Sequence, residues 1–268
     1  MGRIHLMEIH DQTWFPRFLR DYTTEALQLI FNVGGLYFPI VDRLKRALRD
    51  TSARCVLDLC SGAGGPWLWL CKLFEQEGCS PIDVWLTDRY PPARVFDIER
   101  IASRNRIHFH PTPVDATGAP ANLDGFRTLF TSFHHFRPQE ARAILQDAVN
   151  RRQGIGIFEV PGRRVLTVLL VFLMPLADLI LVPFMRPFQW SRLIWSYLIP
   201  VVPIVLWFDG IVSCMRSYSP RELGELISGL SASGYRWDIG EEKGFFFALP
   251  VTYLIGFPNP TAKVQKGE

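Results

Sequence analysis

The sequence lacks the features that mark several large classes of protein. Its five cysteines show neither CxxC pairs nor a zinc-type spacing with histidine, so we expect no structural disulfide, no metal site and a reducing, cytosolic setting. Charged residues are 21% and the formal net charge is only +3, which predicts no nucleic-acid partner. The N-terminal residues carry charges throughout and lack the apolar core of a signal peptide.

What the sequence does contain is two long apolar runs. VLTVLLVFLMPLADLILVPFM (165–185) has one charge, Asp178, and LIWSYLIPVVPIVLWF (193–208) has none. The first run is long enough to span a bilayer, but the second is short, and prolines interrupt both. Three interpretations remain open: a transmembrane pair, a shallow hairpin in one leaflet, or a soluble cap over an apolar tunnel or dimer interface. All three predict a lipophilic small-molecule substrate.

Outside these runs, short apolar segments alternate with amphipathic ones. This alternation predicts an α/β fold built on a parallel sheet with helices on both faces. The expected strands cover 54–59, 82–88, 106–116, 126–136, 154–160, 235–242 and 245–257. The expected helices cover most of 12–50 and then 66–78, 92–103, 137–152 and 219–230.

The first strand runs into a glycine-rich loop, VLDLCSGAGG (56–65), which precedes a helix. Glycines let a backbone approach a ligand, and the helix start offers free N–H groups, so this pattern predicts a nucleotide-binding crevice. Three acids, Asp58, Asp88 and Asp115, stand at the ends of three consecutive strands. Parallel strands end at one edge of a sheet, so we expect these acids to line one crevice, where Asp88 accepts both ribose hydroxyls.

VLDLCSGAGG resembles the first motif of the class I, Rossmann-like S-adenosylmethionine-dependent methyltransferases, although Cys60 stands where that motif usually has glycine. The resemblance covers about 50–160 and 213–257. It implies a mostly parallel seven-stranded sheet closed by an antiparallel pair, with the apolar helical hairpin inserted after strand five, and S-adenosyl-L-methionine as cofactor. The cofactor-binding residues that it implies are Asp58, Ser61, Gly62, Gly64, Asp88, Arg89, Asp115, Ala116 and Ser132.

The same resemblance implies a division of the chain. An N-terminal helical segment, 1–53, covers the site, and the methyltransferase domain takes 54–162 and 210–258. The apolar helical hairpin, 163–209, forms the insertion. We expect membrane association through 165–208 with the catalytic domain facing the cytoplasm; the sequence predicts no oligomeric state.

Candidate catalytic residues follow strands four and five. His134 and His135 stand in TSFHHF (131–136), and histidine titrates near neutral pH, so either could serve as a general base. The alternative is that one packs under the loop and the other caps it. Glu159 ends strand five and is a third candidate, although it could equally pair with Arg163 or Arg164.

Candidate substrate-binding residues are Trp14, Asp209, Arg216 and Tyr218. For Trp14 the alternative is core packing, and Asp209-Gly210 is also a turn signal. These residues together favour methyl transfer to a lipophilic or membrane-derived acceptor. The alternatives are a non-catalytic, membrane-associated binding or scaffold protein with this fold, or a different use of the cofactor. Methylation of nucleic-acid bases is disfavoured, because the fourth strand lacks an Asn/Asp-Pro-Pro-aromatic signature.

Overall fold

The computed structural model describes residues 2–91, 106–243 and 249–259. The helix expected at 92–103 and the beginning of the strand expected at 245–257 lie outside the described residues.

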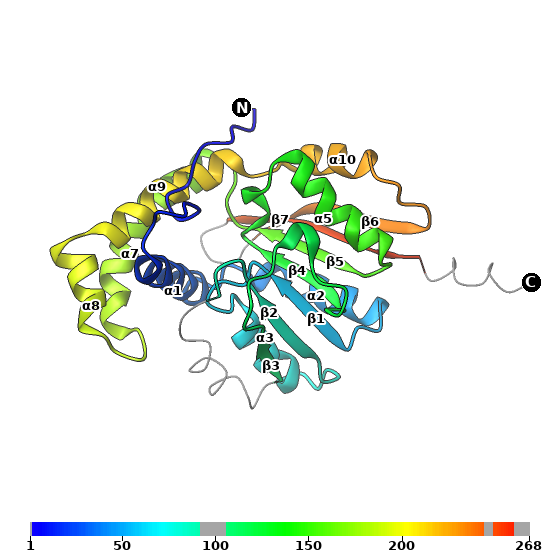
Figure 1. Cartoon of the computed structure of the whole chain (residues 1–268), viewed down its shortest axis with the longest axis horizontal. Coiled ribbons are helices and arrows are strands. Elements are labelled where there is room, and N and C mark those ends of the chain that lie inside the picture. The colour runs from blue at the N-terminus through cyan, green and yellow to red at the C-terminus, as the bar shows by residue number, and fades with distance from the viewer. Residues whose placement is uncertain (1, 92–105, 244–248, 260–268) are drawn as a thin grey trace, which may run out of the picture.

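One seven-stranded sheet forms the centre of the molecule, in the order β3-β2-β1-β4-β5-β7-β6 (Figure 1). The first five strands run parallel, and β7 is antiparallel to both β5 and β6. Each residue of β4 and β5 is buried, as expected for central strands covered on both faces. The strands are β1 (Cys55–Leu59), β2 (Asp83–Thr87), β3 (Ile107–Phe109), β4 (Phe126–Phe130), β5 (Ile155–Glu159), β6 (Tyr235–Lys243) and β7 (Pro250–Pro258).

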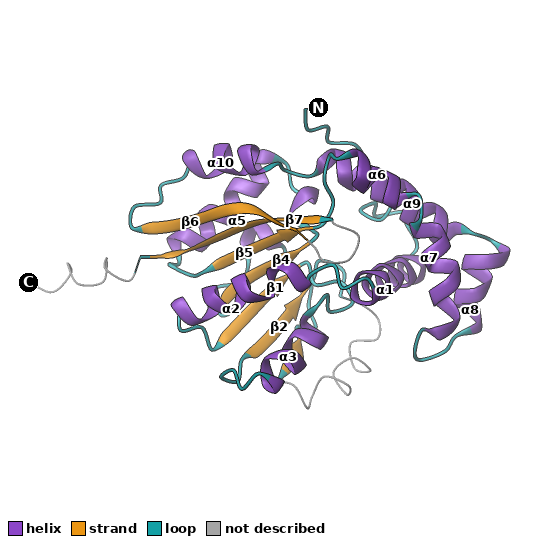
Figure 2. Cartoon of the chain, turned by 180° about the vertical axis from the view of Figure 1, so that it is seen from behind, coloured by secondary structure: helices purple, strands orange, loops and turns teal. Residues whose placement is uncertain are grey.

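Helices cover both faces of this sheet (Figures 1 and 2). On one face, α2 (Val41–Asp50) and α3 (Trp67–Gln76) bury Leu44 and Trp67 in the first core cluster. On the other, α5 (Pro138–Asn150) and α10 (Pro220–Ser228) contribute to the second. The predicted fold, a mostly parallel seven-stranded sheet between two helical layers, is confirmed.

Two predicted strands end early. The third stops at Phe109, because Pro111 and Pro113 cannot donate to a sheet ladder, and a 3-10 turn, η3 (Ala116–Gly118), follows. The fourth stops at Phe130, and the rest of TSFHHF forms a second 3-10 turn, η4 (Phe133–His135). Both histidines therefore lie on a turn beyond the sheet edge.

The apolar runs form a broken bundle of helices that extends from one side of the sheet (Figure 2). The pieces are α6 (Val165–Val171), α7 (Met174–Leu181), η5 (Val182–Phe184), α8 (Trp190–Leu193), η6 (Ile194–Leu198) and α9 (Val201–Arg216). The 20 residues of Val165–Phe184 have a mean hydropathy of 2.7, enough by length and composition to cross a membrane. The later pieces, Trp190–Leu198 and Val201–Arg216, pass the same test only together, with a bend of 66°.

The N-terminal helix α1 (Arg17–Val33) packs against α7 and α9. Phe15, Leu19 and Ala26 form a third buried cluster with Val202 and Leu206 of α9. This packing joins the start of the chain to the apolar bundle.

The turn interpretation of Asp209-Gly210 is wrong, because both residues lie inside α9, which continues to Arg216. The Asp209 carboxylate accepts hydrogen bonds from the backbone N–H groups of Ile9 and His10, at 2.8 and 2.9 Å. These tertiary contacts replace the local turn that Asp-Gly otherwise favours.

Candidate active site

A cavity of about 630 Å³ lies where the carboxyl ends of the strands face α1 and the apolar bundle. That volume is within the range usual for small-molecule sites, about 300–1,000 Å³. Its lining combines polar residues from the strand ends with apolar residues from the bundle. Among the apolar ones are Leu170, Leu173, Met174, Ala177 and Leu206. One enclosure thus offers both a polar and an apolar environment.

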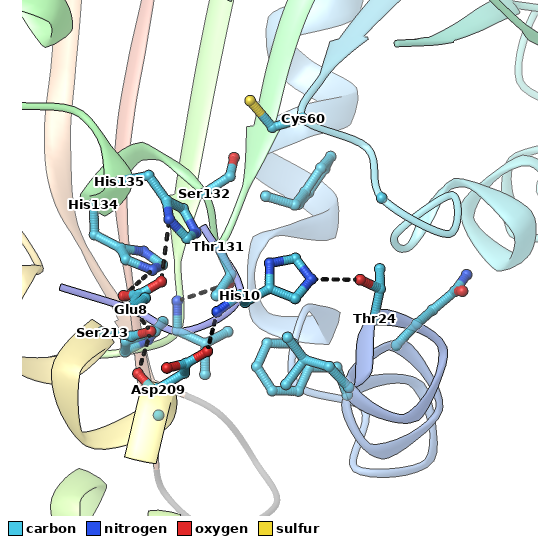
Figure 3. A pocket seen from close by; sticks show the side chains of 18 of the residues that line it. Glu8, His10, Thr24, Cys60, Thr131, Ser132, His134, His135, Asp209 and Ser213 are labelled. Atoms are coloured by element: carbon cyan, nitrogen blue, oxygen red, sulfur yellow. Dashed lines mark hydrogen bonds and ion pairs between the residues drawn. The ribbon is translucent and has the colours of Figure 1, made fainter. Parts of the chain in front are cut away.

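The glycine-rich loop enters this cavity on a strained backbone. Cys60 has a φ of 57°, in the left-handed region, and its side chain is drawn beside the cavity in Figure 3. Gly62 has a φ of 53°, and a Cβ there would lie 2.6 Å from Thr24 Cγ2 of α1. The loop therefore needs glycine at 62, where α1 approaches it closely.

Ser61 ties the loop to the second strand. Its Oγ donates to the carbonyl of Asp58 and accepts from the N–H of Thr87, and its own N–H donates to the carbonyl of Thr87. Ser61 and Gly62 both line the cavity.

Asp88 follows β2 and lines the cavity. Its Oδ2 accepts from the N–H of Gly62 and its Oδ1 from the N–H of Tyr90, each at 2.8 Å. Burial raises the pKa of this carboxyl, and the two N–H groups oppose that rise. Each oxygen has a further lone pair, so the carboxylate can still accept from two ligand hydroxyls.

The structure places Asp58 differently from the prediction. Its side chain is 1% exposed, accepts from Thr128 Oγ1 at 2.5 Å and does not line the cavity. Burial raises the pKa of Asp58 to about 7. Gly64 is likewise absent from the lining. In this structure Asp58 supports the loop through its carbonyl, which accepts from Ser61 Oγ, and Gly64 is part of the loop itself.

Four more of the expected cofactor-binding residues line the cavity: Arg89, Asp115, Ala116 and Ser132. Asp115 caps η3 by accepting from the N–H and Oγ1 of Thr117, at 2.9 and 2.6 Å, and these bonds lower its pKa. Asp88 and Asp115, which follow β2 and β3, thus line the same cavity, whereas Asp58 of β1 is not part of its lining.

His134 and His135 both line the cavity, on η4. Glu159 does not: its Oε1 accepts from the N–H groups of Ser132 and Phe133, and its Oε2 lies 2.7 Å from His134 Nδ1. Glu159 therefore acts through His134 and the turn. Its alternative partners bind elsewhere, Arg163 to Glu222 and Arg164 to Glu241.

The sequence did not predict the two acids that face these histidines. Glu8 is 2% exposed, with Oε2 3.1 Å from His135 Nδ1 and Oε1 3.6 Å from His134 Nε2 (Figure 3). Asp11 Oδ1 lies 2.9 Å from His135 Nδ1. Burial alone would lower the pKa of His135, but Glu8 and Asp11 together raise it to about 9. The only sequence signal that touched them was the expectation that the N-terminal segment, 1–53, covers the site.

Arg216 lines the cavity and completes the cluster. Its Nη1 donates to Asp11 at 2.8 Å and lies 3.3 Å from Glu8 Oε1, while its Nη2 donates to the carbonyl of His135. Asp209 lines the cavity too, although the backbone of the N-terminal segment occupies both its oxygens. Both residues hold the segment that carries the acids.

Two predicted substrate contacts lie away from the cavity. Trp14 is 65% exposed and packs edge-on against Phe15, so neither the substrate role nor burial in the core describes it. Tyr218 is buried, donates its hydroxyl to the carbonyl of Phe136 and packs under Arg3. Tyr218 is thus a structural support behind η4.

The backbone of Cys60 gives a stability prediction. Replacing Cys60 with glycine should raise the free energy of unfolding by about 1 kcal/mol, because a left-handed conformation is costly for residues other than glycine. The measurement is the urea midpoint at unchanged slope. Cys60→Ala, which keeps a Cβ at the same φ, is the control; an equal gain in both variants would show that the thiol, not the backbone, is the cause.

The sequence matches no family model, and no curated protein matches it. Similar solved structures do exist. PigF with SAH aligns at a TM-score of 0.51 and 14% identity over 92% of this chain and 62% of that one. A putative O-methyltransferase from Nostoc punctiforme aligns at 0.50 and 10% identity over 96% and 64%. This chain spans less than two thirds of the length of either structure.

Proposed function

We propose that this chain, which has the fold of the class I S-adenosylmethionine-dependent methyltransferases, transfers a methyl group from S-adenosylmethionine to a lipophilic acceptor. The observation that carries the proposal is the single cavity in which Asp88 and the glycine loop meet the apolar side chains of α6, α7 and α9. A polar, charged cofactor and an apolar acceptor need such a mixed enclosure.

The strand-end residues fit the cofactor chemically. Asp88 offers carboxylate lone pairs for the ribose hydroxyls, and Asp115 with Ala116 offers an acid and a backbone beside them for the adenine. PigF, one of the similar structures, was solved with SAH. When bound, the sulfonium supplies an electrophilic methyl group, and the chain's part is to hold the acceptor in line with it.

His134 and His135 are proposed to act on the acceptor, with Glu159 as the positioning residue. Both histidines line the cavity, and Glu159 fixes the ring of His134 through Nδ1. A proton carried by the acceptor would be received at His134 Nε2, because Glu159 holds that ring's own proton on Nδ1, whereas the acids around His135 raise its pKa to about 9 and keep it protonated.

The proposed acceptor is lipophilic because the bundle is apolar outside as well as inside. Leu169, Phe172, Leu176 and Ile180 are each more than half exposed. The one charge within the runs, Asp178, points inward and is 1% exposed; Arg192, just before the second run, is 3% exposed and paired with Glu25. An apolar exterior with inward charges suits a lipid environment better than water.

We further propose a membrane-associated protein whose sheet lies on the cytoplasmic side. The five cysteines are free thiols, which suits a reducing compartment. Among the three interpretations of the apolar runs, the 66° bend in the second run favours a hairpin that dips into one leaflet over a straight transmembrane pair.

The direct test supplies methyl-labelled S-adenosylmethionine to detergent-purified protein with either a total lipid extract or an aqueous metabolite extract. We expect label to appear in organic-soluble product, at least tenfold above a heat-inactivated control. Label transferred only in the aqueous extract would overturn the lipophilic acceptor. Cofactor binding without transfer to either extract would favour the non-catalytic binding protein.

A further inference from the structure

The cluster at the cavity wall has the spacing of metal ligands. Nitrogens of His134 and His135 and a Glu8 oxygen lie within 4.8 Å of one another. The nearest pairs are 3.1 Å, from His135 Nδ1 to Glu8 Oε2, and 3.6 Å, from His134 Nε2 to Glu8 Oε1. Ions with bonds of about 2.1 Å hold neighbouring donor atoms about 3.0–3.4 Å apart, so the two nitrogens and one Glu8 oxygen, which lie within 4.8 Å of one another, would need to draw together by at most ~1.4 Å to reach that range around one ion.

The ring of His134 is oriented as in a metal ligand. Its Nδ1 lies 2.7 Å from Glu159 Oε2, and a carboxylate only accepts, so Nδ1 carries the proton. In the neutral ring, Nε2 then presents a lone pair toward Glu8. Metal-bound histidines nearly always donate their other N–H to a carboxylate or carbonyl in this way.

His134 Nε2 also lacks a hydrogen-bond partner among the described residues, although the side chain is 1% exposed. Its distance to Glu8 Oε1, 3.6 Å, is too long for a hydrogen bond. A buried nitrogen left unsatisfied is costly, and a bound ion would remove that cost.

The charges around the cluster favour a cation. Three carboxylates, Glu8, Asp11 and Glu159, outnumber Arg216, the one guanidinium that pairs with them among the described residues, and a bound ion would displace the proton that His135 Nδ1 shares with Glu8 and Asp11. Arg216 is held behind η4, because its Nε donates to the carbonyl of His134 and its Nη2 donates to the carbonyl of His135. One divalent ion would balance the remaining negative charge.

We propose that His134 Nε2, His135 Nδ1 and the Glu8 carboxylate bind a divalent first-row transition-metal ion at the cavity wall. Two imidazoles and one carboxylate are the donor set that zinc, iron and their neighbours take, whereas magnesium and calcium prefer oxygen alone. Asp11, 2.9 Å from His135 Nδ1, stands beside the three as a further oxygen donor. All three residues line the cavity, so an ion bound by them would be accessible to an acceptor oxygen.

The test measures metal binding itself, with neither cofactor nor acceptor present. A negative result would therefore count against the metal site alone and not against the proposed methyl transfer. Chelator-treated protein is titrated with Co²⁺ or Zn²⁺ by calorimetry, and Co²⁺ binding is also followed by its visible absorption. We expect one ion per chain with a micromolar or lower Kd. Glu8→Ala and His134→Ala should each weaken binding at least ~100-fold, because each removes a ligand. The matched control is His5→Ala: His5 lines the same cavity outside the cluster, and this variant should bind normally.

Glu159→Gln separates ligation from a structural role. The amide keeps the shape and an oxygen for Ser132 and Phe133, but its NH₂ donates to His134 Nδ1 and moves the ring proton to Nε2. Metal affinity should fall about 10–100-fold in a chain that remains folded by circular dichroism. The proposal is overturned if the wild-type chain binds neither ion below millimolar concentration, or if it binds with an affinity that none of these variants changes. Either result would make the cluster an ion-pair network only.

Discussion

Replacing Asp88 with alanine is expected to lower the affinity for S-adenosylmethionine at least ~100-fold. Hydrogen bonds to a charged group contribute about 1.5–3 kcal/mol each, and two ribose hydroxyls would lose theirs together. The variant also frees the N–H of Gly62, which Asp88 holds at 2.8 Å, so the glycine loop loses a support. Titration calorimetry of the purified protein measures the change.

Two variants make this result specific. Asp88→Asn keeps one acceptor oxygen and should show an intermediate loss. Asp83→Ala removes an acid from the other end of the same strand, where it forms an exposed pair with Arg106, and should bind as the wild type does. Equal affinity of the wild type and Asp88→Ala, both folded, would exclude this crevice as the cofactor site.

Introducing aspartate at Leu169, Leu176 and Ile180 together is expected to lower partitioning onto lipid vesicles at least ~100-fold. These side chains are 59, 55 and 57% exposed on α6 and α7. Burying one leucine or isoleucine side chain contributes about 1.5–3 kcal/mol, and inserting aspartate adds an opposing cost. Flotation with zwitterionic vesicles measures the partitioning without electrostatic attraction to the lipid.

The control adds the same three charges elsewhere. Gln139, Ala143 and Asn150 are exposed on α5, which covers the sheet rather than the bundle. Aspartate at these positions should leave flotation unchanged. If both triple variants float like the wild type, the exposed apolar side chains do not contact lipid, and the soluble-cap interpretation takes their place.

The sheet was predictable because its information is local. Short apolar runs, glycine loops and capped helices each occupy a few neighbouring residues, and their alternation decides the fold class. The early end of β3 also has a local cause, Pro111. The sequence prediction extended the strand past this proline, because further apolar residues follow it. The breaks in the bundle at 172–173 and 199–200 were predicted only as prolines, not as separate helices.

The candidate site was predictable where the chain carries it on strand ends. Asp88, Asp115 and His134 each follow a strand, and parallel strands bring such residues to one edge. Glu8 and Asp11 could not be found this way, because a contact between residues 200 positions apart, Asp209 with Ile9, holds their segment in place. The burial of Asp58 could not be found this way either, because its partner Thr128 lies on another strand, 70 positions along the chain.

The continuity of α9 constrains how the chain can vary in length. Its exposed Trp207 and Phe208 and its buried Arg216 share one uninterrupted helix. Each residue of an α-helix turns the chain by about 100° and advances it by about 1.5 Å. A single insertion or deletion between Phe208 and Arg216 would therefore swing the guanidinium away from Asp11 or turn the aromatic rings inward. Natural variants of this protein should exchange residues freely on the outer side of α9, yet keep its length fixed.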